Sequence, residues 1–549
     1  MRKAFLTLSL IFLVGNIAQA QLFGRQPDFT RQDTLRGSIT PERAWWDVTY
    51  YHLSVAVNLD DSSISGTNVI QYKVLEEGVG RMQIDLQEPM YINKVLLSGK
   101  RLEFEKEGNA YFVTLPKTQR KGSINEITVD FYGKPKVAIR APWDGGFTWT
   151  KDGNGKPFIA TSNQGIGASI WWPNKDHGYD EPDSMRISVT TPKDLMDVSN
   201  GRLEKVEEHK NDTKTWHWFV SNPINNYGVN INIGDYVHFG EKFAGEKGEL
   251  DMDYYVLREN KEKAIQQFAD APRMMKAFEH WFGPYPFYED SYKLVEAPYL
   301  GMEHQSSITY GNKYENGYLG RDLSQSGWGL KFDFIIIHES GHEWFANNIT
   351  YRDVADMWIH ESFTNYSESL FLEYHYGKEA GSEYVIGTRL NILNDRPIIG
   401  IYDVNYEGSS DMYYKGANML HTIRQIMNDD EKWRMMLRGL NKEFYHQTVT
   451  TKQIEEYISK AVGRDLTPVF DQYLRDVRIP MLEYTFKNGK LFYKWTNAIR
   501  KFDMPVKVFI DGEEVLLKPL TRWQSITSFG KNLVVDHNYY VGNLNTLGN

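Results

Sequence analysis

Cysteine is absent from all 549 residues of this chain. The protein therefore has no disulfide, no thiolate nucleophile and no Cys-ligated metal, and its stability must come from packed cores alone. Clusters of basic residues are also missing, and 62 Lys and Arg stand against 72 Asp and Glu, which gives a formal net charge of −10. An acidic chain without a basic cluster is a poor candidate for binding nucleic acid or an anionic membrane surface.

Apolar runs long enough to span a membrane are lacking, and the one apolar run at the N-terminus is short. It extends from Ala4 to Val14, after Arg2-Lys3 and before the small-residue pattern Ala18-Gln19-Ala20. This order is typical of a secretory signal peptide, which we expect over residues 1–20, with export to the periplasm or the extracellular space. An uncleaved membrane anchor is the alternative, but the run is too short to cross a bilayer comfortably.

Low-complexity tracts and internal repeats are absent too, and 41% apolar residues indicate a globular protein. A chain of this length exceeds one ordinary core, so we expect several domains. From about residue 46 to 243, apolar residues such as Tyr51, Leu53 and Val55 alternate with polar or small ones, which predicts strands. Between about 245 and 480, apolar residues recur at helical spacing, as in the segments 261–280, 332–347 and 362–376.

The last part of the chain returns to a strand-like pattern. Asn488-Gly489 and Asp511-Gly512 each separate two apolar runs, which predicts tight hairpins with type I′ turns. We therefore expect a multidomain α+β protein with a β-rich domain at 21–244, a mainly helical domain at 245–480 and a small β-sandwich at 481–549.

The strongest chemical signal is the motif His338-Glu339-Ser340-Gly341-His342. On a helix, histidines at i and i+4 project from one face and suit a single Zn²⁺ ion. A catalytic zinc site has three protein ligands and one open position for water, and two histidines with a glutamate are an established ligand set. Glu361 follows His342 after eighteen residues and is the expected third ligand. In such a motif Glu339 is expected to be the general base.

The alternative interpretation of this motif, without a metal, is a surface helix with two solvated histidines. The apolar residues Phe334 to Ile337 precede it and Trp344 and Phe345 follow it, which predicts a buried helix. Buried ionisable groups need partners, and a metal ion supplies one. We therefore expect one Zn²⁺ per chain.

The segment from His338 to Glu368 resembles the gluzincin metallopeptidases of the aminopeptidase N and leukotriene-hydrolase type, whose pattern is HExxH, eighteen residues and a glutamate. The resemblance extends from about residue 46 to about residue 480. It implies an N-terminal β-saddle domain and a thermolysin-like catalytic domain. The large helical C-terminal domain of many members is expected to be missing here, which puts its role in covering the active site in doubt.

The resemblance also implies roles for residues outside the zinc motif. Tyr413, in Tyr413-Tyr414-Lys415-Gly416, corresponds to the tyrosine of the family's Y-E-K-G, which stabilises the oxyanion; its neighbour Tyr414 is a rival. Gly301, Met302 and Glu303 are similar to the family's G-x-M-E-N loop, whose glutamate binds the substrate's free α-ammonium group. The loop departs from that pattern at Leu300 and His304.

Two further residues are predicted to support the site. Gln164 lies where relatives place a Gln or Glu that also contacts the substrate amine, although a structural glutamine is a common alternative. Glu368 lies two helical turns after Glu361 and is predicted to accept a hydrogen bond from a ligating histidine, with a solvated glutamate as the alternative.

These features together predict an exported zinc aminopeptidase that acts on peptides with a free N-terminus. A thermolysin-like endopeptidase is one rival, and it would need no amine anchor such as Glu303. A catalytically silent zinc scaffold is the other, and the presence of Glu339 and Tyr413 beside the ligands argues against it. The preferred N-terminal residue, any epoxide-hydrolase activity and the oligomeric state cannot be read from the sequence.

Overall fold

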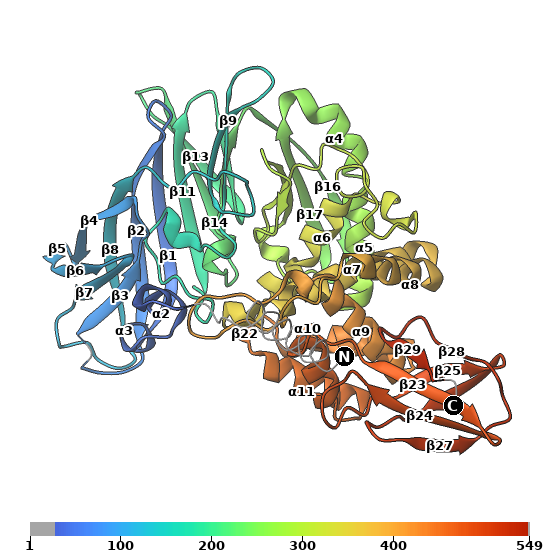
Figure 1. Cartoon of the computed structure of the whole chain (residues 1–549). Helices are drawn as coiled ribbons and strands as arrows, with labels where there is room; N and C mark the ends of the chain where they lie inside the picture. Colours follow the sequence, from blue (N-terminus) through green and yellow to red (C-terminus); the bar gives the residue numbers. More distant parts are fainter. Residues whose placement is uncertain (1–27, 79, 547–549) are drawn as a thin grey trace, which may run out of the picture.

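The computed structural model describes residues 28–78 and 80–546, which form three regions along the chain (Figure 1). The predicted signal peptide lies outside the described residues. The first region is built on an eight-stranded sheet with the order β13-β14-β11-β1-β2-β8-β4-β5. Its strands are β1 (Trp46–Asn58), β2 (Ser63–Val74), β4 (Met90–Leu97), β5 (Lys100–Leu102), β8 (Ile124–Gly133), β11 (Ser184–Pro192), β13 (Arg202–Glu208) and β14 (Thr213–Val220).

The alternation predicted for the first strand is confirmed, since Tyr51, Leu53 and Val55 are buried in β1. Two smaller sheets complete the region. They consist of β12 (Met196–Ser199), β15 (Ile231–Gly234), β10 (Pro157–Ser162) and β9 (Gly146–Lys151), and of β3 (Arg81–Asp85), β7 (Ala110–Thr114) and β6 (Phe104–Glu107). Buried apolar residues from all three sheets form one core.

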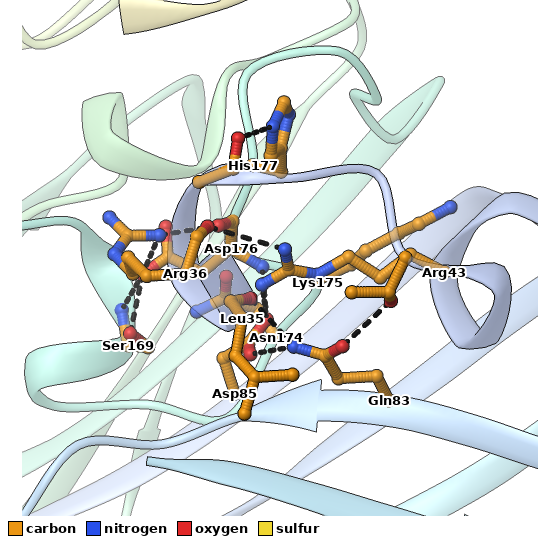
Figure 2. Close-up of polar contacts among 12 residues, drawn as sticks. Leu35, Arg36, Arg43, Gln83, Asp85, Ser169, Asn174, Lys175, Asp176 and His177 are labelled. Carbon is orange, nitrogen blue, oxygen red and sulfur yellow. Dashed lines mark hydrogen bonds and ion pairs between the residues drawn. The ribbon is translucent and has the colours of Figure 1, made fainter. Parts of the chain in front are cut away.

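Two short helices, α2 (Arg31–Gly37) and α3 (Pro41–Ala44), precede the first strand and lie against this region. Buried and partly buried ion pairs hold them against the sheets, as Figure 2 shows. Arg43 is fully buried and pairs with Asp85 at 2.6 Å, and Arg36 pairs with Asp176 at 3.0 Å. We call residues 28–45 the N-terminal strap; their sequence signalled neither these helices nor these pairs.

The second region combines a five-stranded sheet, of order β16-β17-β18-β20-β19, with helices (Figure 1). The strands are β16 (Tyr236–Gly245), β17 (Gly248–Leu257), β18 (Tyr292–Glu296), β19 (Gly301–Met302) and β20 (Ile308–Tyr310). The helices are α4 (Lys261–Gln267), α5 (Asp270–Phe282), α6 (Phe334–Gly341), α7 (Trp358–Tyr376), α8 (Lys378–Gly387), α9 (Tyr414–Met427), α10 (Asp430–Glu443), α11 (Thr451–Val462) and α12 (Thr467–Leu474), and β21 (Ile349–Tyr351) pairs with β22 (Gln447–Val449). This sheet already begins at Tyr236, ahead of the predicted domain boundary at residue 245.

Two of the predicted helices are interrupted. The segment predicted as one helix over 261–280 is broken between α4 and α5, and α5 restarts with Pro272 in its first turn, where its missing N–H costs nothing. The helix predicted over 332–347 is regular only as α6. After His342 the backbone departs from helical geometry at Phe345 and Ala346.

The third region is a two-sheet β structure, shown in red in Figure 1. One sheet holds β27 (Gln524–Thr527), β24 (Lys490–Thr496), β23 (Met481–Lys487) and β29 (Gly542–Asn545), and the other β26 (Glu513–Leu517), β25 (Val506–Ile510) and β28 (Leu533–Val535). Both predicted hairpins are confirmed, with Asn488, Gly489, Asp511 and Gly512 all at positive φ. The three-part α+β fold is thus confirmed, and residues 481–546 contain no helix. Across the described residues, no helix is both long and apolar enough to cross a membrane.

Candidate active site

The predicted ligands come from two buried helices that pack side by side. His338 lies in α6, His342 caps its C-terminal end, and Glu361 lies in the first turn of α7. Gly341 allows this approach, because a Cβ atom there would come within 2.7 Å of Ser367 Oγ on α7. The structure therefore brings together two motifs that are separated by eighteen residues in the sequence.

The geometry of these three side chains fits a metal ion. Glu361 Oε2 lies 3.4 Å from His342 Nε2 and 3.8 Å from His338 Nε2. Ligand atoms about 2.1 Å from a tetrahedral zinc ion are roughly 3.4 Å apart, so the spacing is suitable. Glu361 Oε2 is buried and has no hydrogen-bond partner among the described residues. A buried carboxylate oxygen without a partner is costly, and a cation held by these two histidines and this glutamate removes the cost.

Both histidines are oriented by groups on their far side. His338 Nδ1 lies 2.8 Å from Glu368 Oε1, the contact expected from the sequence. Glu368 is itself held by Asn365 Nδ2, which donates at 2.9 Å, and by the hydroxyl of Tyr384, which donates at 2.6 Å. With Nδ1 occupied in this way, Nε2 of His338 is the nitrogen free for a metal.

The irregular backbone after α6 serves the second histidine. His342 Nδ1 lies 3.1 Å from the carbonyl oxygen of Phe345 and 3.1 Å from Thr364 Oγ1. In a regular helix the Phe345 carbonyl would point along the helix axis and away from His342. The break at Phe345 and Ala346 therefore turns this carbonyl toward the ring, and His342 Nε2 faces Glu361.

Glu339 lies beside the ligands and against β19. A Cβ atom on Gly301 would come within 2.6 Å of Ile335 Cγ2 and 3.0 Å of Glu339 Oε1, so glycine allows β19 to lie close to α6. Burial, opposed by His338 and reinforced by the charge of Glu303, raises the pKa of Glu339 to about 7. A carboxylate with a pKa near neutrality is well suited to take up and release a proton.

Glu303 and Gln164 meet although they come from different regions of the chain. Gln164, in the loop after β10, donates from Nε2 to Glu303 Oε1 at 2.5 Å and to Glu361 Oε1 at 3.1 Å. Glu303 follows β19, and Asn347 Nδ2 donates to its backbone carbonyl at 2.9 Å. Within the described ranges no Lys or Arg pairs with the Glu303 carboxylate, and burial raises its pKa.

Two groups of potential ligands overlap at this place. Besides His338, His342 and Glu361, the side chains of Glu303, Glu339 and His342 also lie within 4.8 Å of one another. We assign the metal to the first group, because its histidines are backed by hydrogen-bond partners and its carboxylate oxygen is without one. The second group then places two further carboxylates next to the metal.

The two tyrosines at the start of α9 occupy different environments. The ring of Tyr413 stacks near that of His338 at 6.1 Å between centroids. Burial and the charge of Glu361 raise the pKa of Tyr413 well above its usual value, so its hydroxyl keeps its proton. For Tyr414, burial and the charge of Glu368 raise the pKa. Tyr413 therefore lies on the ligand side of His338, and Tyr414 on the side of Glu368.

One cavity of about 770 Å³ lies between the first and second regions. It is lined by the three predicted zinc ligands and by Glu339, Gly301, Met302, Glu303, Gln164, Tyr413 and Tyr414, whereas Glu368 and Asn347 lie outside its lining. Several of its residues were missed from the sequence, namely Trp143, Asn365, Arg396 and Glu407. They lie in loops or in the second turn of α7, and no local motif marks them. Tyr384, which donates to Glu368, was also missed, because no sequence pattern shows which hydroxyl pairs with that carboxylate.

Two family models match this chain. The Peptidase family M1 domain matches residues 267–473, and the Peptidase M1 N-terminal domain matches residues 48–227. Together they include every predicted site residue. The resemblance noted in the sequence is thereby confirmed.

Individual relatives are distant. Aminopeptidase N of Lactococcus lactis subsp. lactis is 22% identical over 458 residues, which cover 79% of this chain and 51% of that protein. Leukotriene A-4 hydrolase of Xenopus laevis is 22% identical over 450 residues, covering 76% of this chain and 68% of that protein. The chain thus spans between half and about two thirds of the length of these relatives.

The fold has solved counterparts. The M1 zinc metallopeptidase of Deinococcus radiodurans superposes with a TM-score of 0.66 at 20% sequence identity, covering 80% of this chain and 95% of that one. A mutant of that protein bound to a Tyr-Ser-Ala substrate superposes with a TM-score of 0.65. At this level of identity the likeness shows a shared fold.

Proposed function

The chain belongs to peptidase family M1, and from this premise we propose that it is a zinc-dependent aminopeptidase that hydrolyses the first peptide bond of peptides with a free N-terminus. The observation that carries this proposal is the Glu303 carboxylate beside the metal ligands. It is buried, it accepts a hydrogen bond from Gln164, and no Lys or Arg among the described residues neutralises it. A substrate ammonium group is the cation that this position lacks.

The metal ligands and Glu339 supply the hydrolytic chemistry. Zinc held by His338, His342 and Glu361 would act as a Lewis acid toward the scissile carbonyl and make water acidic enough to react at neutral pH. Glu339, with its pKa raised to about 7, takes the proton from the attacking water. It then delivers a proton to the leaving amine, which breaks the peptide bond.

Tyr413 is the donor to the developing oxyanion. Its hydroxyl keeps its proton because burial and Glu361 raise its pKa. A hydrogen bond aimed at charge that develops only in the transition state lowers the barrier without tightening substrate binding.

Glu303 and Gln164 position the substrate. A peptide α-amino group titrates near about 7.7–8.0 and is largely cationic at neutral pH. Pairing with Glu303 fixes the chain end, so that only the first peptide bond reaches Glu339. An N-acetylated peptide offers no charge to this carboxylate and leaves it buried without a partner.

We also propose that the protein is exported, with cleavage after residue 20. The support is the order of basic, apolar and small residues in the first twenty positions. N-terminal sequencing of the mature protein after expression in a bacterial host tests this, and a start at Met1 in the cytoplasmic fraction would contradict it.

The test of the proposed activity is a matched pair of peptides, one free and one acetylated at the N-terminus, assayed with and without a chelator. We expect release of the first residue from the free peptide only, loss of activity with the chelator and recovery with Zn²⁺. Efficient internal cleavage of the acetylated peptide would instead favour a thermolysin-like endopeptidase. Zinc-loaded protein inactive on every peptide would favour a silent scaffold.

A further inference from the structure

A second cavity of about 510 Å³ adjoins the active-site cavity. Trp143 and Leu300 line both cavities, so the two are neighbours at these side chains. Trp143 is 66% exposed, which is unusual for a tryptophan and leaves its ring available for contact. None of the zinc ligands, Glu339 or Tyr413 lines the second cavity.

The direction of a bound peptide follows from the residues of the site. In the proposed function, the amine lies at Glu303 and the reacting carbonyl at Glu339. Gly301 lies against Glu339, so the step from Glu303 to Gly301 along β19 leads from the amine to the cleaved bond. Residues after that bond continue in the same direction, toward Leu300 and the second cavity.

The backbone of β19 suits an extended peptide. In the five-stranded sheet β19 is the last strand and pairs only with β20 among the described strands. A free strand edge can receive an extended peptide chain through its backbone groups. The peptide can therefore follow β19 from the metal ligands to Leu300 without a turn.

The two cavities differ in charge. The active-site cavity contains five carboxylates, Asp144, Glu303, Glu339, Glu361 and Glu407, against the single cation Arg396. The second cavity contains two lysines, Lys263 and Lys313, and one carboxylate, Glu296. Glu296 is already held by Leu257 N and Asn260 Nδ2, each at 2.7 Å.

Neither lysine has an acidic partner among the described residues. The contact of Lys263 Nζ is to Asn260 Oδ1 at 3.5 Å, which leaves its charge without a counter-ion. By contrast, Lys156 pairs with Asp235 at 2.9 Å. The second cavity therefore presents uncompensated positive charge, next to aromatic walls that include Tyr299 and Tyr314.

We propose that the second cavity is the subsite for the substrate residues that follow the cleaved bond, and that Lys263 and Lys313 bind a carboxylate of that segment. The carboxylate is either the C-terminus of a short peptide or an acidic side chain of a longer one. Trp143, at the junction, covers the segment between the cleaved bond and the lysines. This proposal rests on the proposed aminopeptidase function and adds to it a preference for peptides that are acidic on the leaving side.

The test compares substrates that differ only beyond the first bond. One series contains tri- to pentapeptides of one sequence, each as a free acid and as a C-terminal amide. A second series contains amidated pentapeptides with one Glu or Gln at positions two to four. An aminoacyl amide without any following residue reports on the catalytic site alone. All are assayed with the wild type and with Lys263→Ala, Lys313→Ala, the double variant and Lys276→Ala, an exposed lysine of α5 as control.

For the wild type, we expect a higher kcat/KM for the acidic member of at least one pair. Each lysine substitution should lower that ratio by about two- to fivefold, and the double variant by about tenfold, through KM. The control Lys276→Ala should leave the ratio unchanged, and Lys263→Arg should retain most of it. A ratio that depends on the free C-terminus identifies the terminal carboxylate, and one that depends on Glu against Gln identifies a side chain.

Failure of this proposal is separable from failure of the proposed function. Suppose that the aminoacyl amide and the peptides are hydrolysed. If the ratio of kcat/KM between the acidic and the neutral member is near one in every pair, or does not change when either lysine is replaced, the subsite assignment is wrong. If neither the aminoacyl amide nor any of the peptides loses its first residue, the aminopeptidase function itself is wrong.

Discussion

Two clusters of buried charges in this protein differ in their balance. In the N-terminal strap and the sheets beneath it, three cations meet three anions. Arg36 pairs with Asp176 and Arg43 with Asp85 (Figure 2), and Lys175 pairs with Asp180. In the active site, three carboxylates surround two histidines and none of them pairs with Lys or Arg among the described residues.

This difference distinguishes buried charges that stabilise the fold from buried charges that serve the active site. A buried ion pair that is complete within the chain needs nothing else, and removing one partner leaves a charge stranded. A buried excess of carboxylates is stabilised by cations from outside, which in the proposed function are the metal and the substrate amine. We therefore expect changes in the first cluster to lower stability, and changes in the second to lower activity with little effect on stability.

The largest expected effect is on activity. Glu339→Gln should lower kcat by about 10²–10⁴-fold, because an amide cannot accept the proton of water. The zinc content should stay at one ion per chain, and the thermal midpoint should not fall, since the change removes a buried carboxylate. Steady-state kinetics, metal analysis and calorimetry measure the three quantities, and loss of zinc together with activity would contradict this assignment.

The next effect is on stability. Arg43→Ala leaves Asp85 buried without its partner and should lower the free energy of unfolding by about 3–5 kcal/mol. The matched control is Arg31→Ala, which breaks the exposed pair with Glu107 on the same strap and should cost less than about 1 kcal/mol. Urea denaturation of both variants provides the comparison, and equal losses would show that burial does not distinguish the two pairs.

The third prediction separates the two neighbouring tyrosines. Tyr413→Phe should lower kcat by about 10²–10³-fold if its hydroxyl serves the oxyanion. Tyr414→Phe should have a much smaller effect, because its surroundings are on the Glu368 side of His338. The reverse ranking would assign the oxyanion role to Tyr414.

The active site was more predictable from the sequence than the strap. The ligands were recognisable because two histidines one helical turn apart, followed by an acid at a set spacing, leave a local pattern. The three-part fold was recognisable from the change of apolar periodicity. The Arg36 and Arg43 pairs carry no such pattern, since their partners Asp176 and Asp85 are distant in the chain and each residue alone is typical of a solvated surface.

The backbone break after α6 was not predictable for another reason. Residues 342–347 are mostly good helix formers or apolar, so periodicity extends the helix through them. The observed conformation is set by a tertiary requirement, the turn of the Phe345 carbonyl toward His342. Similarly, the contact of Gln164 with Glu303 joins two regions, and only their packing brings the side chains together.

Arg36 is part of the strap's ion pairs and also contacts the loop that carries Gln164 of the active site. Besides its pair with Asp176, its Nη2 donates to the carbonyl of Ile166 at 3.2 Å, two residues after Gln164. Its neighbour Gly37 lies against the backbone of Asn405, and Asn405 Nδ2 donates to the carbonyl of Gly165 at 3.1 Å. The strap thus holds the loop that carries Gln164 against a loop of the second region.

The smallest predicted effect follows from this position. Arg36→Ala should raise KM for peptides with a free N-terminus by about three- to tenfold. The loop that carries Gln164 loses its hydrogen bond at the Ile166 carbonyl, so Gln164 orients Glu303 less well. Arg36→Lys keeps a positive charge beside Asp176 but lacks the second nitrogen that donates to Ile166. Compared with Arg36→Ala, it should therefore recover most of the stability but little of the KM. Kinetics measured well below the thermal midpoint of each variant separate the two effects. A lowered midpoint with an unchanged KM would place Arg36 wholly among the structural charges.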